Sequence, residues 1–326
     1  MAYSAKMLRL LKDSKRVLVP LHLHPDADSM GSALGLKLIL EGWNKKVDVV
    51  SADPLPENLL FLPKAETIKR IDPASIGRRK HSLLVLLDGN ELRRFAHRDW
   101  PKWVGSIPTI IIDHHTDRTQ GLKGLSLIHP EITSTAEMIF DLAKIWKTKI
   151  SPKIAQCLLT GILADTGHFR YCSTTPEVLE KAAELIRYGA NQNEITRYIF
   201  YSWPPAVINL WKILLKNARI KNRFLYTTLS WEETARANVE ERNLSNAKAY
   251  TANELLGAIA GTKAVAIFAE EDGYVRVNLR SRTQSNVDRI ATALGGGGHK
   301  RAAAFNFKGS IREAIQITTK LLSENK

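Results

Sequence analysis

Short apolar runs that lead into Asp or His residues are the feature of this sequence that most constrains its fold. The runs at 16–23, 82–87 and 109–112 are rich in Val, Ile and Leu, which suits strands buried on both faces. A helical pattern at 153–164 leads into another such residue. The acidic and histidine residues at these places are His22, Asp26, Asp28, Asp88, Asp113, His114, His115 and Asp165.

Helical patterns alternate with these strand patterns. Apolar residues recur at helical spacing in 30–42, 134–147 and 153–164. Strands that alternate with helices predict an α/β fold with a mostly parallel sheet covered by helices. Because the carboxyl ends of parallel strands line one crevice where ligands bind, we expect the Asp and His residues to converge there.

The pattern changes after Pro205. Runs at 224–229, 264–269 and 274–280 are typical of strands, and the last alternates as an antiparallel strand does. We therefore expect a second, smaller α/β domain with a mixed sheet. The predicted boundaries are 1–190 for the first domain, 191–217 for a helical linker and 218–326 for the second domain.

Composition narrows the class of protein. The 326 residues carry a formal net charge of +14, which fits an anionic substrate such as a nucleotide. No apolar run approaches the roughly 20 residues that span a bilayer, and charges interrupt the amphipathic N-terminal segment where a secretion signal would be apolar. The two cysteines, Cys157 and Cys172, suit reduced thiols in a cytoplasmic protein.

The residue types at the strand ends favour divalent metal ions. Carboxylates mixed with imidazoles suit Mn²⁺ best, with Mg²⁺, Co²⁺ or Zn²⁺ as alternatives. The acids suffice for two ions that share a ligand, an arrangement that promotes displacement at phosphorus. Each residue also has an ordinary explanation: Asp26, Asp28 and Asp88 suit turns, and Asp113 suits a helix cap. Their coincidence in one alternating domain favours the metal site.

Four consecutive glycines, 295–298, stand before His299. Their backbone N–H groups can surround an anion, although the run can also cap the helical pattern at 287–294. Arg280 and Arg282 favour anion binding, because guanidinium groups pair with phosphates. Alternation along a strand settles only that the intervening Ser281 faces away from them.

These motifs resemble those of the DHH family of phosphoesterases, named for a triplet present here as Asp113-His114-His115. The segments 22–32, Asp88 and 165–170 match the family's other motifs in order and spacing. The C-terminal part, with Arg280-Ser281-Arg282 and the glycine run, is similar to the DHHA1 substrate-binding domain. The resemblance covers essentially the whole chain and is strongest to the oligoribonuclease and pAp-phosphatase (nanoRNase) subgroup.

The resemblance implies a role for each matching residue. His22 and Asp26 would hold one metal ion, whereas Asp28, His114 and Asp165 would hold the other. Asp88 would bridge the two ions and, with His115, take part in catalysis. The residues implied to bind substrate are His115, Arg280, Ser281, Gly296, Gly297, Gly298 and His299.

The function implied is metal-dependent hydrolysis of short RNA or DNA, two to five nucleotides long, to nucleoside 5′-monophosphates, or of pAp to AMP and phosphate. Water activated by two ions, with Mn²⁺ preferred, would attack phosphorus. The resemblance also implies a homodimer. Two alternatives stay open: a pyrophosphatase or exopolyphosphatase of the same fold, and a non-catalytic nucleotide- or RNA-binding protein.

Three places depart from the family pattern without removing a proposed ligand. Ala27 stands where the family commonly has Gly, and Ala304, near the C-terminus, also stands where Gly is frequent. The pair Gly89-Asn90 follows Asp88 where Ser or Thr is frequent, which would alter the groups that surround the ligands. An active enzyme is therefore expected.

Overall fold

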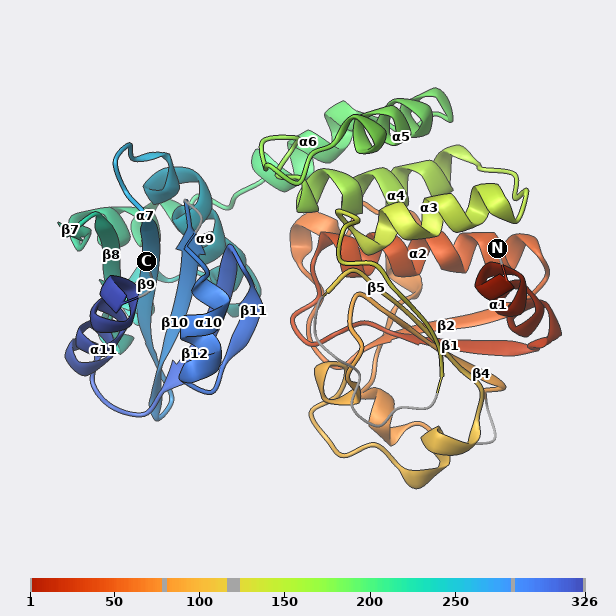
Figure 1. The fold of residues 1–326 in the computed structure, drawn as a ribbon, viewed down its shortest axis with the longest axis horizontal. Helices are drawn as coiled ribbons and strands as arrows, with labels where there is room; N and C mark the ends of the chain where they lie inside the picture. The colour runs from red at the N-terminus through yellow and green to blue at the C-terminus, as the bar shows by residue number, and fades with distance from the viewer. Residues whose placement is uncertain (1, 78–80, 116–123, 283–284, 325–326) are drawn as a thin grey trace. The chain divides into compact units, whose positions relative to one another are not determined.

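The computed structural model describes residues 2–77, 81–115, 124–282 and 285–324. The chain divides into two compact units, Met1–Ser202 and Trp203–Lys326 (Figure 1). Each unit has a six-stranded sheet and hydrophobic cores of its own.

The sheet of the first unit is parallel throughout and has the order β3-β2-β1-β4-β5-β6. Every residue of β4 and β5 is buried, as the apolar runs predict. The strand order reverses between β1 and β4, so the carboxyl ends of these strands border the crevice where such sheets bind ligands. The strands are β1 (Arg16–Pro20), β2 (Lys46–Ser51), β3 (Lys69–Arg70), β4 (Leu83–Leu87), β5 (Thr109–Asp113) and β6 (Leu125–Ile128).

α-Helices cover one face of this sheet, where they bury the larger core of the unit (Figure 1). Two of them, α2 and α4, approach closely because glycines lie at their contact. A Cβ on Gly31 would stand 2.5 Å from the carbonyl oxygen of Cys157, and one on Gly35 would stand 2.5 Å from Leu158. The helices are α1 (Ala2–Asp13), α2 (Ala27–Gly42), α3 (Thr135–Ile145), α4 (Pro152–Asp165), α5 (Pro176–Arg187) and α6 (Gln192–Phe200).

The cover of the opposite face of the sheet differs from the helices that the sequence predicts. Phe95 and Val104, from the segment between β4 and β5, pack there against Leu18, Leu84 and Ile111. That segment has the short 3₁₀ helices η5 (Leu92–Arg94) and η6 (Lys102–Ser106). The predicted α/β class with a mostly parallel sheet is confirmed, and one face has a thinner cover than a helix provides.

The second unit has a mixed sheet in the order β11-β12-β10-β9-β8-β7, in which β8 and β9 pair in parallel and the other neighbours are antiparallel. Alternate residues of β9 face two separate cores, one on each side of the sheet. The strands are β7 (Arg219–Lys221), β8 (Phe224–Leu229), β9 (Ala264–Glu271), β10 (Tyr274–Ser281), β11 (Gly297–His299) and β12 (Ala302–Phe307). The helices are α7 (Val207–Lys216), α8 (Trp231–Ala237), α9 (Glu241–Tyr250), α10 (Val287–Ala293) and α11 (Ile311–Glu324).

Two helices lie in the segment predicted as a linker, 191–217. Helix α6 contributes Ile195 to the core of the first unit, and α7 contributes Leu210 and Leu214 to a core of the second. The linker and the exact domain limits stay predictions. Among the described residues, no helix combines the length and apolar character needed to cross a membrane.

Candidate metal centre

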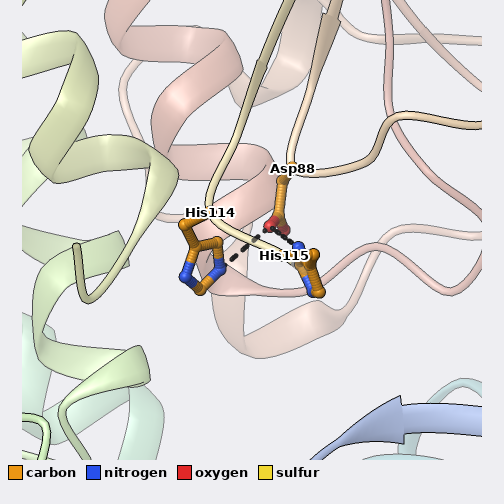
Figure 2. A group of neighbouring side chains, drawn as sticks. All are labelled: Asp88, His114 and His115. Atoms are coloured by element: carbon orange, nitrogen blue, oxygen red, sulfur yellow. Dashed lines mark ion pairs between the residues drawn. The ribbon is translucent and has the colours of Figure 1, made fainter. Parts of the chain in front are cut away.

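Asp88 lies at the centre of the site. It follows β4 directly, is 2% exposed, and has a φ of 59°, a backbone conformation that Asp and Asn tolerate better than most residues. One carboxylate oxygen, Oδ2, lies 3.2 Å from His22 Nε2. The other, Oδ1, lies 3.4 Å from His114 Nε2 and 3.5 Å from His115 Nδ1, and Figure 2 shows both imidazoles directed at it.

All six residues predicted as metal ligands come together around Asp88. Candidate ligand atoms lie within 4.8 Å of one another in three groups. His24, by contrast, contacts Asp53 and belongs to none of these groups. The groups are His22, Asp26 and Asp88; Asp28, His114 and Asp165; and Asp88, His114 and His115.

Two helix N-termini fix the carboxylates of Asp26 and Asp28. Asp26 caps α2, since its Oδ1 accepts a hydrogen bond from Ser29 N at 3.0 Å. The same carboxylate oxygen lies 3.6 Å from His22 Nε2. Asp28 reaches the start of α3, where its two oxygens accept from Thr135 N at 2.7 Å and Ala136 N at 2.9 Å. Both carboxylates therefore have an ordinary structural role, and that role also holds them at the cluster.

Asp113 has a function that the sequence pattern did not assign. It is fully buried, and its Oδ1 lies 2.6 Å from His115 Nδ1 and accepts from His115 N at 3.2 Å. Asp113 therefore fixes the orientation of the His115 ring. The sequence signal for this function was the position of Asp113 directly before two histidines, because a carboxylate beside an imidazole commonly orients the imidazole ring.

The electrostatics of the cluster suit a bound cation. Burial and the charge of Asp88 raise the pKa of Asp28 to about 8, and burial and Asp28 raise the pKa of Asp165 well above its usual range. Burial lowers the pKa of His114, but the hydrogen bond to Asp88 and the charge of Asp165 outweigh it and raise that pKa to about 10. Crowded carboxylates that hold protons in this way are stabilised as anions when a divalent ion replaces the protons. The residues present therefore fit divalent metal ions.

Metal affinity is expected to rise with pH. Asp28, with its raised pKa, holds a proton at neutral pH, and an ion must displace it, so lower pH favours the metal-free protein. We expect Mn²⁺ binding to release protons at pH 7, and the apparent Kd to fall by at least about tenfold per pH unit between roughly pH 6 and 7.5, because Asp165 and His114 hold protons as well. Calorimetric titration in buffers of different ionisation enthalpy measures both effects. An affinity independent of pH would contradict the assignment of Asp28 as a ligand.

The predicted substrate residues lie in the second unit. Arg280 is half-buried on β10, and its Nε donates to Asn253 Oδ1 at 2.8 Å. Ser281 faces the other side and is buried, so its side chain does not share the face of Arg280. The role of both residues in substrate binding stays a prediction.

The glycine run combines a helix end with a strand. Gly295 has a φ of 78° and follows α10, and Gly296 N donates to Ala291 O at 2.8 Å, so the start of the run caps that helix. Gly297 and Gly298 belong to the edge strand β11, which pairs with β12. The side chain of His299 lies outside the described part of the structure. The start of the run acts as the helix cap that the sequence left open, and the binding of an anion by Gly296, Gly297 and Gly298 stays a prediction.

Comparison with known proteins identifies the family. The model of the DHH family N-terminal domain matches residues 16–162, and that of the DHHA1 domain matches 222–324. A bifunctional oligoribonuclease and PAP phosphatase of Thermus thermophilus is 33% identical over 90% of this chain and 84% of its own length. The chain therefore belongs to the DHH family and is a phosphoesterase, an enzyme that hydrolyses phosphoric ester bonds.

Further relatives agree with this assignment. The bifunctional oligoribonuclease and PAP phosphatase of Bacillus subtilis is 25% identical over 91% of both chains. Among solved structures, an exopolyphosphatase-related protein from Bacteroides fragilis superposes with a TM-score of 0.86 over 99% of this chain and 96% of that one, at 24% identity. The structural likeness shows a common fold.

Proposed function

We propose that this enzyme hydrolyses short oligonucleotides of two to five residues to nucleoside 5′-monophosphates, and pAp to AMP and phosphate. The observation that carries the proposal is the sharing of Asp88 between two groups of candidate ligands, one with His22 and Asp26 and one with His114 and His115. His114 also belongs to a third group, with Asp28 and Asp165. Two relatives that match nearly the whole chain are named for both activities, which supports this choice of substrates.

The cluster would hold two divalent ions, with Mn²⁺ preferred and Mg²⁺ or Co²⁺ as alternatives. His22 and Asp26 would bind one ion. The other ion would be bound by Asp28, His114 and Asp165, and Asp88 would bind both ions. Bound ions supply positive charge at the phosphoryl group and lower the pKa of water. Asp88 suits the shared position, because its two oxygens already face different histidines, His22 and His114.

His115 is the residue of this chain that we assign to the substrate phosphate. Asp113 accepts the hydrogen bond of Nδ1, so the ring is held in one orientation and Nε2 is the nitrogen assigned to the substrate. From there it would donate a hydrogen bond to a phosphoryl oxygen, or a proton to the leaving oxygen. Arg280 and the edge strand β11 would bind a second phosphate of the substrate.

A substrate panel tests the proposal. We expect the purified protein, stripped with chelator, to be inactive, and Mn²⁺ to restore release of nucleoside monophosphate from pAp and from pApA. Long single-stranded RNA and pyrophosphate, in parallel reactions, are expected to react far more slowly. Rapid cleavage of pyrophosphate alone would contradict the proposal in favour of a pyrophosphatase, and absence of turnover with every ion would contradict it outright.

A homodimer and a cytoplasmic location are also proposed, on the resemblance to the family alone. Sedimentation equilibrium of the full chain at micromolar concentration tests the first. We expect twice the mass of the 36.5 kDa chain. A monomer at all concentrations would contradict the dimer.

A further inference from the structure

We propose that Asn253 is a positioning residue that holds Arg280 and Arg282 ready for the phosphate at the far end of the substrate. The inference rests on the proposed function, in which Arg280 binds a second phosphate. It adds a residue in a different segment of the chain, which selects substrates that carry that phosphate.

One face of the second sheet carries small residues beside Arg280. Along β10, odd-numbered residues are buried in a core and even-numbered ones, including Arg280, are half-exposed. Opposite them on β12 stand Ala302 and Ala304, and opposite Ala304 on β11 stands Gly297. Within the described part of the chain, no atom lies within 4 Å of the place where a Cβ on Gly297 would be. Small residues therefore stand beside Asn278 and Arg280 on this face of the sheet.

Asn253 contacts both arginines from an irregular helical segment. Its side-chain Oδ1 accepts from Arg280 Nε at 2.8 Å, and its backbone oxygen accepts from the Arg282 guanidinium. It lies in a single π-helical turn, η7 (Thr251–Leu255), between α9 and the 3₁₀ turn η8 (Leu256–Ala258). Such turns widen a helix and are frequent at functional sites. Here the turn places one residue so that its side chain and its backbone each bind an arginine.

Gly257 provides the space that Arg282 occupies. A Cβ at this position would overlap the Arg282 guanidinium, whose atoms are the nearest to it. The glycine has no positive φ, so its conformation alone does not require the absence of a side chain. A side chain at this position would require the exposed Arg282 guanidinium to move away from Asn253. Two features of the segment, Asn253 and Gly257, thus serve the same pair of arginines.

Fixing the guanidinium groups matters because long side chains lose freedom when they bind. In Arg280, Nε donates to Asn253 Oδ1 and Nη1 donates to Leu279 O at 2.9 Å, so the plane of the guanidinium is fixed before a phosphate binds. Without Asn253 Oδ1, the Arg280 side chain loses its conformational freedom only when the substrate binds, and this loss of entropy weakens binding. The loss should therefore appear only with substrates that carry the second phosphate.

The test compares pApA with ApA, which differ only in the 5′-phosphate. We expect wild-type enzyme to prefer pApA in kcat/KM, and Asn253→Ala to reduce this preference by about tenfold, mainly through a higher KM. Hydrolysis of ApA, which the metal centre carries out without that phosphate, should change little. A second variant, Asn253→Asp, keeps an acceptor for Arg280 but offsets its charge, so it should fold normally and also lose preference for pApA.

Asn306→Ala is the matched control. Asn306 Oδ1 accepts from Arg276 Nη1 at 2.8 Å, a contact of the same kind between β12 and an earlier residue of β10. We expect this variant to keep the wild-type preference. Equal losses with both substrates in Asn253→Ala and unchanged preference in Asn253→Asp would show a merely structural role and overturn the inference. A wild-type enzyme without preference for pApA also overturns it, whereas one inactive on both substrates overturns the proposed function.

Discussion

Replacement of Asp88 by Asn is expected to lower phosphoester hydrolysis by at least about a thousandfold while the fold is retained. The substitution removes one negative charge from a carboxylate that lies within 3.5 Å of three histidines. Asn keeps the shape of the side chain and tolerates the φ of 59°, so loss of activity cannot be attributed to backbone strain. Steady-state hydrolysis of pAp with Mn²⁺ measures the effect.

A matched variant separates this effect from a general change of charge. Asp99 is an exposed carboxylate of the same unit, and Asp99→Asn should keep wild-type activity. Calorimetric titration of both variants should show weaker Mn²⁺ binding only for Asp88→Asn. Substantial activity of Asp88→Asn at saturating Mn²⁺ would contradict the shared-ligand role of Asp88.

Gly161→Ala is expected to damage both stability and the metal centre. A Cβ at this position on α4 would lie 2.5 Å from Asp28 Oδ1 and 2.6 Å from the Ala136 Cβ, so the helices must separate or Asp28 must move. Overpacking of this kind costs roughly 1–3 kcal/mol of unfolding free energy. Because the displaced atom belongs to a proposed ligand, Mn²⁺ affinity should fall as well. Urea denaturation and metal titration measure the two losses.

Gly42→Ala provides the contrast within a neighbouring helix. Among the described residues, none has an atom within 4 Å of a Cβ at Gly42, which is exposed at the end of α2. Alanine favours helix more than glycine by up to about 1 kcal/mol, so this variant should be as stable as wild type or slightly more stable. Equal stability of both variants would show that the α2–α4 contact yields easily and that Gly161 is not needed for the position of Asp28.

The buried elements were predictable because their sequence patterns are strong. The runs at 82–87 and 109–112 correspond to β4 and β5, whose residues are all buried. Strands β3, β7 and β11 are two or three residues long, and β11 is mostly glycine, which has little strand propensity. These short strands form because they pair with a neighbouring strand, and their own sequences contain no pattern that predicts a strand.

Convergence of the candidate ligands was also predictable, because parallel strands bring their carboxyl ends to one edge. Their hydrogen-bond partners were not. Asp28 is held by backbone N–H groups of α3, more than 100 residues away, and Arg280 by Asn253 from another segment. Such contacts depend on how helices pack, and a sequence pattern records only the spacing within each element.

Anomalous diffraction from a crystal soaked in Mn²⁺ tests the two-ion site most directly. We expect two peaks, one beside His22 and Asp26 and one beside Asp28, His114 and Asp165, with Asp88 next to both. We also expect Asp88→Asn to weaken or remove them. Absence of manganese from this cluster, or manganese bound only elsewhere on the chain, would contradict the assignment of these residues as ligands.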